Sequence, residues 1–114
     1  MFFHLQCYSE YSIIKSLLKI DTLVLETKNR FMSSVALTDE DNLFGCVKFY
    51  KYSLLNGIKP IIGCDILIKD DVFEKKYRLI LLCKNFSGYK ILNKLLTRSR
   101  FLDKNLCYIY KNWL

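Results

Sequence analysis

The sequence predicts an α/β fold, because apolar strand-like runs alternate with helical patterns along the 114 residues. Four short runs have the near-continuous hydrophobicity of buried, mainly parallel strands. Three other segments repeat apolar residues at the three- and four-residue spacing of amphipathic helices. Strands that follow one another through helices are joined by right-handed crossovers. The expected architecture is one sheet with helices packed on it, within a single domain.

The expected strands are residues 2–7, 33–39, 60–68 and 77–84. Between the third and the fourth, the polar segment DDVFEKKY (residues 70–77) predicts a loop or a hairpin. After Arg100 the pattern weakens.

The expected helices are residues 22–31, 43–56 and 88–99. Side chains that can accept a backbone hydrogen bond precede each helix, and the predicted N-caps are, in order, Asp21, Asp41 or Asn42, and Ser87. Gly57 is expected to end the second helix in a left-handed conformation.

The second helix repeats apolar residues at helical spacing, at Leu43, Val47, Tyr50 and Leu54. Most aromatic residues also fall at spacing that indicates a core position, namely Phe44, Phe49, Tyr50 and Tyr89. This placement favours a core role for these rings over a role in stacking on nucleic-acid bases.

Composition indicates a folded cytoplasmic chain. Apolar residues make up 52% of the sequence, which is enough to form a core. No apolar run approaches the roughly 20 residues that cross a bilayer, and the N-terminus lacks the pattern of a signal peptide. We therefore expect no membrane partner.

The five cysteines are expected to be reduced thiols that act as small core residues. Their number is odd and they form no C-x-x-C pair, so they fit neither a disulfide framework nor a zinc knuckle. They are Cys7, Cys46, Cys64, Cys83 and Cys107.

The formal charge of +7 has two interpretations. Clustered lysines and arginines can neutralise nucleic-acid phosphates. The abundance of Lys, Asn, Ile, Tyr and Phe together is also typical of an AT-rich genome, and this interpretation is favoured. The basic cluster at Arg98 to Arg100 is expected to be a solvated helix end.

Polar residues collect where the expected strands end. In α/β folds the loops at the carboxyl ends of parallel strands carry the chemistry, so these residues are expected to share one face. They are Ser9, Glu10, Asp39, Glu40, Asp41 and Asp65.

Four segments are similar, in order and spacing, to the N-terminal PHP (polymerase and histidinol phosphatase) domain of bacterial replicative DNA polymerase III alpha subunits. These segments are HLQCYSEYS, ALTDEDNLFGCVKFYK, NGIKPIIGCDI and LILLCKNFSGYKILNKLLTRS. The resemblance runs from Phe2 to about Arg100. It implies the N-terminal part of a distorted (β/α)7 barrel, of which about four strands and three helices are present, so the barrel is incomplete. Residues 1–100 would be the N-terminal part of the domain, and residues 101–114 a truncated continuation of it.

The resemblance also implies a metal site whose ligands this sequence has lost. Metal-binding members carry His at the positions of Gln6, Tyr8 and Glu40, Asp at that of Lys15, and Glu at that of Asp65. Their divalent ions would activate water against a phosphodiester. Gln and Tyr are poor ligands beside imidazole, so we expect a degenerate site with no catalytic residue, no metal and no cofactor.

The polar residues that remain there form a possible pocket of His4, Lys15, Asp39, Glu40 and Asp65. Lys15 either supplies the charge that the metal once supplied, by pairing with a nearby carboxylate, or points to solvent. His4 is expected to be structural, and Asp39 can equally cap a turn. Ser16 and Phe31 stand where the family pattern has glycine, which affects the loop geometry.

Three functions are weighed. The resemblance implies a non-catalytic segment of the alpha subunit that serves in DNA replication as scaffold and as docking surface for a proofreading exonuclease subunit. Its partners would be that subunit and the rest of the alpha chain, with DNA reached only through the complex. The alternatives are a phosphoesterase or 3'-5' exonuclease with a residual site at Asp39, Glu40 and Asp65, and a small module that binds single-stranded nucleic acid.

Overall fold

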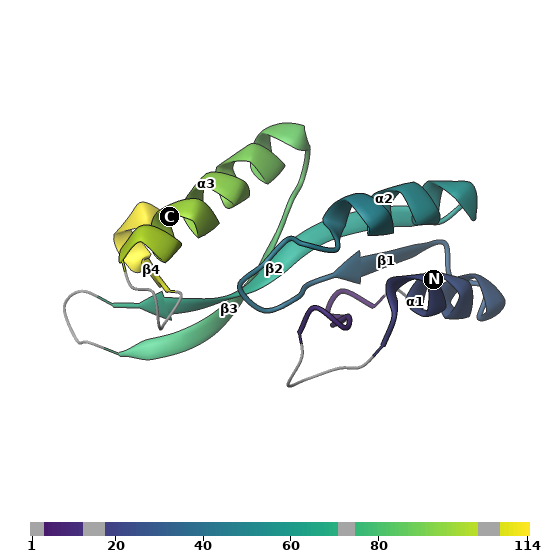
Figure 1. Ribbon diagram of the computed structural model, residues 1–114, viewed down its shortest axis with the longest axis horizontal. Coiled ribbons are helices and arrows are strands. Elements are labelled where there is room, and N and C mark those ends of the chain that lie inside the picture. The colour runs from purple at the N-terminus through teal and green to yellow at the C-terminus, as the bar shows by residue number, and fades with distance from the viewer. Residues whose placement is uncertain (1–3, 13–17, 71–74, 103–107) are drawn as a thin grey trace.

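The computed structural model describes residues 4–12, 18–70, 75–102 and 108–114 (Figure 1). The strands are β1 (Ser34–Leu37), β2 (Lys59–Lys69), β3 (Lys76–Leu82) and β4 (Ile109–Tyr110). The helices are α1 (Ile20–Asn29), α2 (Cys46–Leu55), α3 (Phe86–Leu102) and a 3-10 turn, η1 (Lys111–Trp113). The predicted α/β class, with four strands, three α-helices and an open sheet, is confirmed for the described part of the chain.

The long strand β2 organises the sheet. Its first part pairs in parallel with β1, from Ser34 opposite Lys59 to Leu37 opposite Ile62. Its second part pairs antiparallel with β3, and its end pairs in parallel with β4. In Figure 1, α2 lies along the first half of β2 and α3 along the second half. Each half of β2 therefore has its own covering helix.

The fourth predicted strand runs in a direction that was not expected. Residues 77–84 were predicted as a buried, mainly parallel strand, but β3 is antiparallel to β2 and most of its residues are exposed. The reason is the polar segment before it. The amide of Asp70 bonds the carbonyl of Lys75 at 2.9 Å, so the chain folds back as a hairpin, which confirms the hairpin prediction.

The first predicted strand, residues 2–7, is only partly within the described residues. There it contributes one isolated bridge, in which His4 lies parallel to Val35. Two further backbone bonds, from Ala36 to the His4 carbonyl and from Thr38 to the Cys7 carbonyl, hold the segment beside β1. The segment lies where a strand was expected, although it forms no regular ladder.

The predicted helix starts were wrong by two or three residues. α1 begins at Ile20, so Asp21 lies inside its first turn. α2 begins only at Cys46, because the Asn42 side chain accepts a hydrogen bond from the Phe44 amide and forms a turn before the helix. α3 begins at Phe86, and its cap is Asn85, whose side-chain oxygen accepts the Gly88 amide at 3.0 Å.

Two hydrophobic clusters form the core. The first joins α1, β1, α2 and the residue before β2 through Ile20, Leu23, Val24, Val35, Leu37, Phe49 and Ile58. The second joins β2, α3 and β4 through Cys64, Ile66, Ile68, Leu92, Leu96 and Ile109. The second cluster connects the second half of the long strand to α3.

The prediction of core-facing aromatics was wrong except at Phe49. Phe49 is fully buried, whereas Phe44 and Tyr50 are exposed and Tyr89 is half-buried. The buried side of α2 carries Cys46, Phe49 and Ser53, one position away from the predicted apolar stripe. The stripe at Val47, Tyr50 and Leu54 faces solvent.

The described cysteines, Cys7, Cys46, Cys64 and Cys83, are free thiols, and Cys107 lies outside the described residues. Cys64 is fully buried and donates its S–H to the Asp39 carbonyl at 3.2 Å. Burial raises the pKa of the Cys46 thiol to about 11, so it is protonated at neutral pH.

Two helices end in the same motif with different residues. After α2, Gly57 has a φ of 71°, as predicted, and the Gly57 and Ile58 amides bond back to the last turn. After α1, Phe31 occupies the equivalent position with a φ of 60°, and its side chain is 96% exposed. Phe31 thus adopts a conformation that favours glycine and gains no burial in return.

Replacing Phe31 with glycine should raise the free energy of unfolding by about 1 kcal/mol, because glycine adopts a positive φ without a clash at Cβ. Phe31→Ala is the matched control, since it removes the same exposed ring but keeps the Cβ. Denaturant titration of the three chains measures the difference. Equal unfolding free energies for the glycine and alanine variants would contradict this account.

Candidate functional site

The acidic loop after β1 lies against the middle of β2. The Asp65 amide bonds the Asp39 carbonyl, and the Asp41 amide bonds the Asp65 carbonyl, each at 3.0 Å. Glu40 and Asp65 form an isolated parallel bridge. These backbone contacts bring the polar residues of the loop after β1 and of the middle of β2 to one corner, which we call the acidic corner and define as Asp39, Glu40, Asp41 and Asp65.

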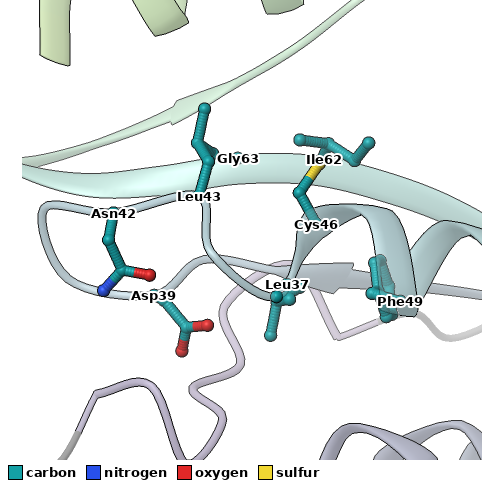
Figure 2. A pocket seen from close by; sticks show the side chains of 9 residues that line it. Leu37, Asp39, Asn42, Leu43, Cys46, Phe49, Ile62 and Gly63 are labelled. Carbon is teal, nitrogen blue, oxygen red and sulfur yellow. The ribbon is translucent and has the colours of Figure 1, made fainter. Parts of the chain in front are cut away.

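Asp39 fastens the N-terminal segment to this corner. Its buried carboxylate accepts the Ser9 amide and the Ser9 hydroxyl, each at 2.6 Å, and the Ser12 hydroxyl at 2.8 Å. Ser12 in turn accepts the Glu40 amide at 2.9 Å. Figure 2 shows the Asp39 and Asn42 side chains on the loop, both pointing away from β2. Asp39 therefore has a structural role as the acceptor that closes the loop.

The cavity drawn in Figure 2 is too small for an organic ligand. It lies between this loop, α2 and β2, and its free volume is about 10 Å³. A single water molecule needs about that much space. The side chains around it are packed as core.

Asp65 is the centre of the acidic corner. Its side chain is buried, and one oxygen accepts the Tyr8 hydroxyl at 2.5 Å. Tyr8 also accepts the Gln6 amide group at 2.7 Å. The two residues at the family's His-x-His positions thus form a short hydrogen-bond chain that ends on Asp65.

Arg78 of β3 supplies a positive charge to the corner. Its Nε donates to Asp65 Oδ1 at 2.8 Å, and a terminal nitrogen donates to the Asp65 carbonyl at 2.8 Å. The same guanidinium lies 3.4 Å from Asp41 and 4.0 Å from Glu40. Burial disfavours its charge, but the hydrogen bond to Asp65 and the nearby carboxylates leave the pKa of Arg78 above its usual value.

Burial and the charge of Arg78 act in opposite directions on the Asp41 carboxyl. Burial raises the pKa of the Asp41 carboxyl, and the neighbouring Arg78 opposes this rise. Asp41 also has a φ of 55°, which belongs to the left-handed region. The loop therefore places Asp41 in an unusual conformation that brings its carboxylate to Arg78.

The other residues of the predicted pocket have different positions. Lys15 lies outside the described residues, so its pairing with the carboxylates stays a prediction. His4 is exposed and bonds β1 through its backbone carbonyl. Sequence reasoning missed Arg78. Its signal is the hairpin, because Asp65 pairs with Ile80, and Arg78 is the diagonal neighbour on the same face.

The residues present do not fit the divalent ion that the family resemblance implies. Gln6 donates to Tyr8, Tyr8 donates to Asp65, and the carboxylate oxygens already contact a guanidinium. Among the described residues, no three His, Cys, Asp or Glu side chains are grouped so that they could share an ion. The described side chains of the corner form a hydrogen-bonded network around Arg78.

Replacing Asp39 with alanine should lower the free energy of unfolding by roughly 3 kcal/mol, because buried donors lose a charged acceptor. Ser12→Ala removes one of the bonds to Asp39 and should cost roughly 1 to 2 kcal/mol. Denaturant titration of both variants and the parent chain tests whether Asp39→Ala loses more unfolding free energy than Ser12→Ala. A loss for Asp39→Ala below that for Ser12→Ala would refute the structural role.

The chain matches the PHP domain over residues 4–114. It is 44% identical over 103 residues to DNA polymerase III subunit alpha of Borreliella burgdorferi, a match that covers 82% of this chain and 9% of that protein. It is 37% identical over 115 residues to the subunit of the same name from Haemophilus influenzae. This match covers 99% of this chain and 10% of that protein. The chain thus spans about a tenth of the length of these relatives.

Two solved structures share its fold. One is an amidohydrolase from Chromobacterium violaceum, with sulfate bound and no metal, at a TM-score of 0.68 and 18% identity. The other is described as a metal-dependent phosphoesterase from Bifidobacterium adolescentis, at a TM-score of 0.67 and 17% identity. Each match covers 87% of this chain and 33% of the other. At these identities the likeness concerns the fold alone.

Proposed function

The chain belongs to the PHP domain family, and from this premise we propose that it is the N-terminal PHP segment of a replicative DNA polymerase III alpha subunit. In this proposal it acts in the cytoplasm as a non-catalytic scaffold and as a docking surface for a proofreading exonuclease subunit. Residues 1–100 form the N-terminal part of the domain and residues 101–114 continue it. The rest of the alpha chain completes the barrel, and DNA is reached through the complex.

The observation that supports a non-catalytic role is the Arg78 guanidinium inside the acidic corner. Hydrolysis of a phosphodiester by a metal site needs ligand oxygens that are free to hold ions and water. Here Asp65 gives one oxygen to Arg78 and the other to Tyr8. The side chains of the corner therefore stabilise the fold. In this proposal the activity of the domain is binding to another protein.

A groove of about 570 Å³ supports the docking role. It lies between the first turns of α2 and α3 and the start of β2, where the two helices approach each other in Figure 1. Its walls include Val47 and Tyr50 of α2 and Phe86 of α3, which are 60%, 48% and 68% exposed. Exposed apolar surface of this kind marks an interaction site.

The charge of the groove indicates the chemistry of the partner segment. Lys51 and Lys84 lie at the groove, and among the described residues neither forms an ion pair. No acidic side chain in the described part of the chain lines it. The complementary occupant is a segment of the exonuclease subunit that carries apolar side chains between acidic ones.

The rings here are less suited to single-stranded nucleic acid. Lys90 lies over the Phe86 ring at 4.8 Å, and Arg100 lies over the Phe44 ring at 5.0 Å. Phe86 also stacks on Tyr89 at 6.1 Å. Base stacking needs open ring faces, and a cation already lies over one face of Phe86 and of Phe44. The observations therefore favour a protein partner.

Replacing Val47 with glutamate should weaken binding of the exonuclease subunit by at least about tenfold, because it places a charge in the apolar groove. The measurement uses the full alpha subunit and the exonuclease subunit of the same organism in a titration. Leu55→Glu is the matched control, since Leu55 is on the same helix, is 82% exposed and lies outside the groove lining.

Equal affinity for the Val47→Glu and parent subunits would refute the docking site. A salt-sensitive affinity for single-stranded DNA that falls in Lys51→Ala and Lys84→Ala, with exonuclease binding unchanged, would favour the nucleic-acid module instead. The enzymatic alternative requires metal-dependent phosphodiester hydrolysis that Asp65→Asn abolishes.

A further inference from the structure

A second hollow continues the docking groove along α3. Its free volume is about 330 Å³, it lies between α3 and the loop before α2, and it shares Tyr89 with the groove. Its α3 side carries Tyr89, Asn93, Thr97 and Arg100, which recur every three or four residues and therefore share one helix face. In Figure 1, α3 runs from the first turn of α2 toward β4, so this face extends the groove in that direction.

The side of the track nearer α2 is an exposed apolar row. Phe44 lines the hollow, Val47 and Tyr50 line the groove, and all three side chains are exposed. At about 1.5 Å of rise per residue, Phe86 and Arg100 lie about 21 Å apart along α3. An extended peptide of about six residues covers this distance, so one short segment can contact both ends of the track.

Arg100 is oriented at the far end of the track. One of its terminal nitrogens donates to the Asp41 carbonyl at 2.9 Å, and its guanidinium carbon lies 5.0 Å from the centre of the Phe44 ring. Among the described residues Arg100 forms no ion pair, and the Asp41 carboxylate lies 3.4 Å from Arg78 instead. A guanidinium has five N–H donors and binds a carboxylate through two of them at once. Arg100 is therefore positioned to receive a carboxylate.

The track carries charge of one sign. Lys51 and Lys84 lie at the groove and Arg100 at the hollow, and no acidic side chain of the described residues lines either cavity. The hollow also has apolar walls at Leu43 and Leu96. Positive charge beside apolar surface complements a protein segment with acidic and apolar side chains.

We propose that the segment of the exonuclease subunit that fills the groove continues along α3 and places an aspartate or glutamate carboxylate on Arg100. This inference rests on the proposed docking role, because the occupant is the same subunit. Arg100 fixes the register of the bound segment, since its contact with a carboxylate is directional. Lys51 and Lys84 are exposed and act mainly on the rate of association.

The test is a titration of the full alpha subunit with the exonuclease subunit of the same organism. Arg100→Ala should weaken binding roughly tenfold or more, because a charged hydrogen-bonded pair is lost. Lys94→Ala is the matched control. Lys94 is exposed on the same helix, lines neither cavity and removes the same charge, so its loss should stay below about threefold.

A second variant leaves the contact between Arg100 and the Asp41 carbonyl in place. Asn93→Asp has nearly the same shape and adds a carboxylate to the hollow, where it competes with the partner for Arg100. It should weaken binding roughly tenfold. Asn93→Ala adds no charge and should stay within about threefold of the parent subunit.

Charge reversal separates a direct contact from a structural role. Arg100→Glu should weaken binding by about 100-fold, because two carboxylates then face each other. A scan of the exonuclease subunit that replaces its acidic residues with lysine, one at a time, should find a variant that recovers at least about tenfold with Arg100→Glu. A purely structural role of Arg100 would give no such recovery.

The outcomes distinguish this inference from the docking proposal. If Val47→Glu weakens binding while Arg100→Ala and Asn93→Asp match their controls, the carboxylate contact is wrong and the groove stands. If none of these variants weakens binding, both are wrong. A loss for Arg100→Ala and Asn93→Asp without one for Val47→Glu would keep the hollow and contradict the groove. Reduced affinity for single-stranded DNA in Arg100→Ala, with exonuclease binding unchanged, would also overturn the inference.

Discussion

The burial of two carboxylates, one in the loop after β1 and one within β2, determines how this domain is arranged. Asp39 and Asp65 are each 2% exposed, and a buried charge needs hydrogen bonds or a counter-charge. Asp39 obtains donors from the serines of the N-terminal segment, and Asp65 obtains Tyr8 and Arg78. The N-terminal segment, the loop after β1 and the hairpin strand meet at this corner because each supplies a group that the two carboxylates require.

The parts of the fold that were predictable depend on local signals. The α/β class follows from the alternation of apolar runs and helical patterns, and the hairpin follows from the polar segment at residues 70–77. Gly57 marks a helix end because few other residues adopt its φ. Helix starts were less predictable. Asp41 and Asn42 can both cap a helix, but Asn42 uses its side chain to form a turn, so α2 starts later.

The site was predictable in part for a similar reason. The rule that parallel strands carry their polar residues at their carboxyl ends is enough to expect Asp39, Glu40 and Asp65 in one region. It does not reveal Arg78, whose position depends on the register of an antiparallel pair. A shift of one residue in that register would turn Arg78 to the opposite face of the sheet. Residues whose role depends on register become visible only in the folded chain.

The exposed face of α2 shows how packing selects between two apolar stripes. One stripe, with Cys46 and Phe49, faces the core cluster shared with α1 and β1, so the adjacent stripe at Val47 and Tyr50 is left in solvent. The acidic corner has its counter-charge, Arg78, within the domain, whereas Lys51 and Lys84 beside the exposed stripe form no ion pair in the described part of the chain. Apolar surface and unpaired positive charge therefore coincide at the groove. A partner gains more from binding there than at the corner, because the corner would have to lose internal pairs first.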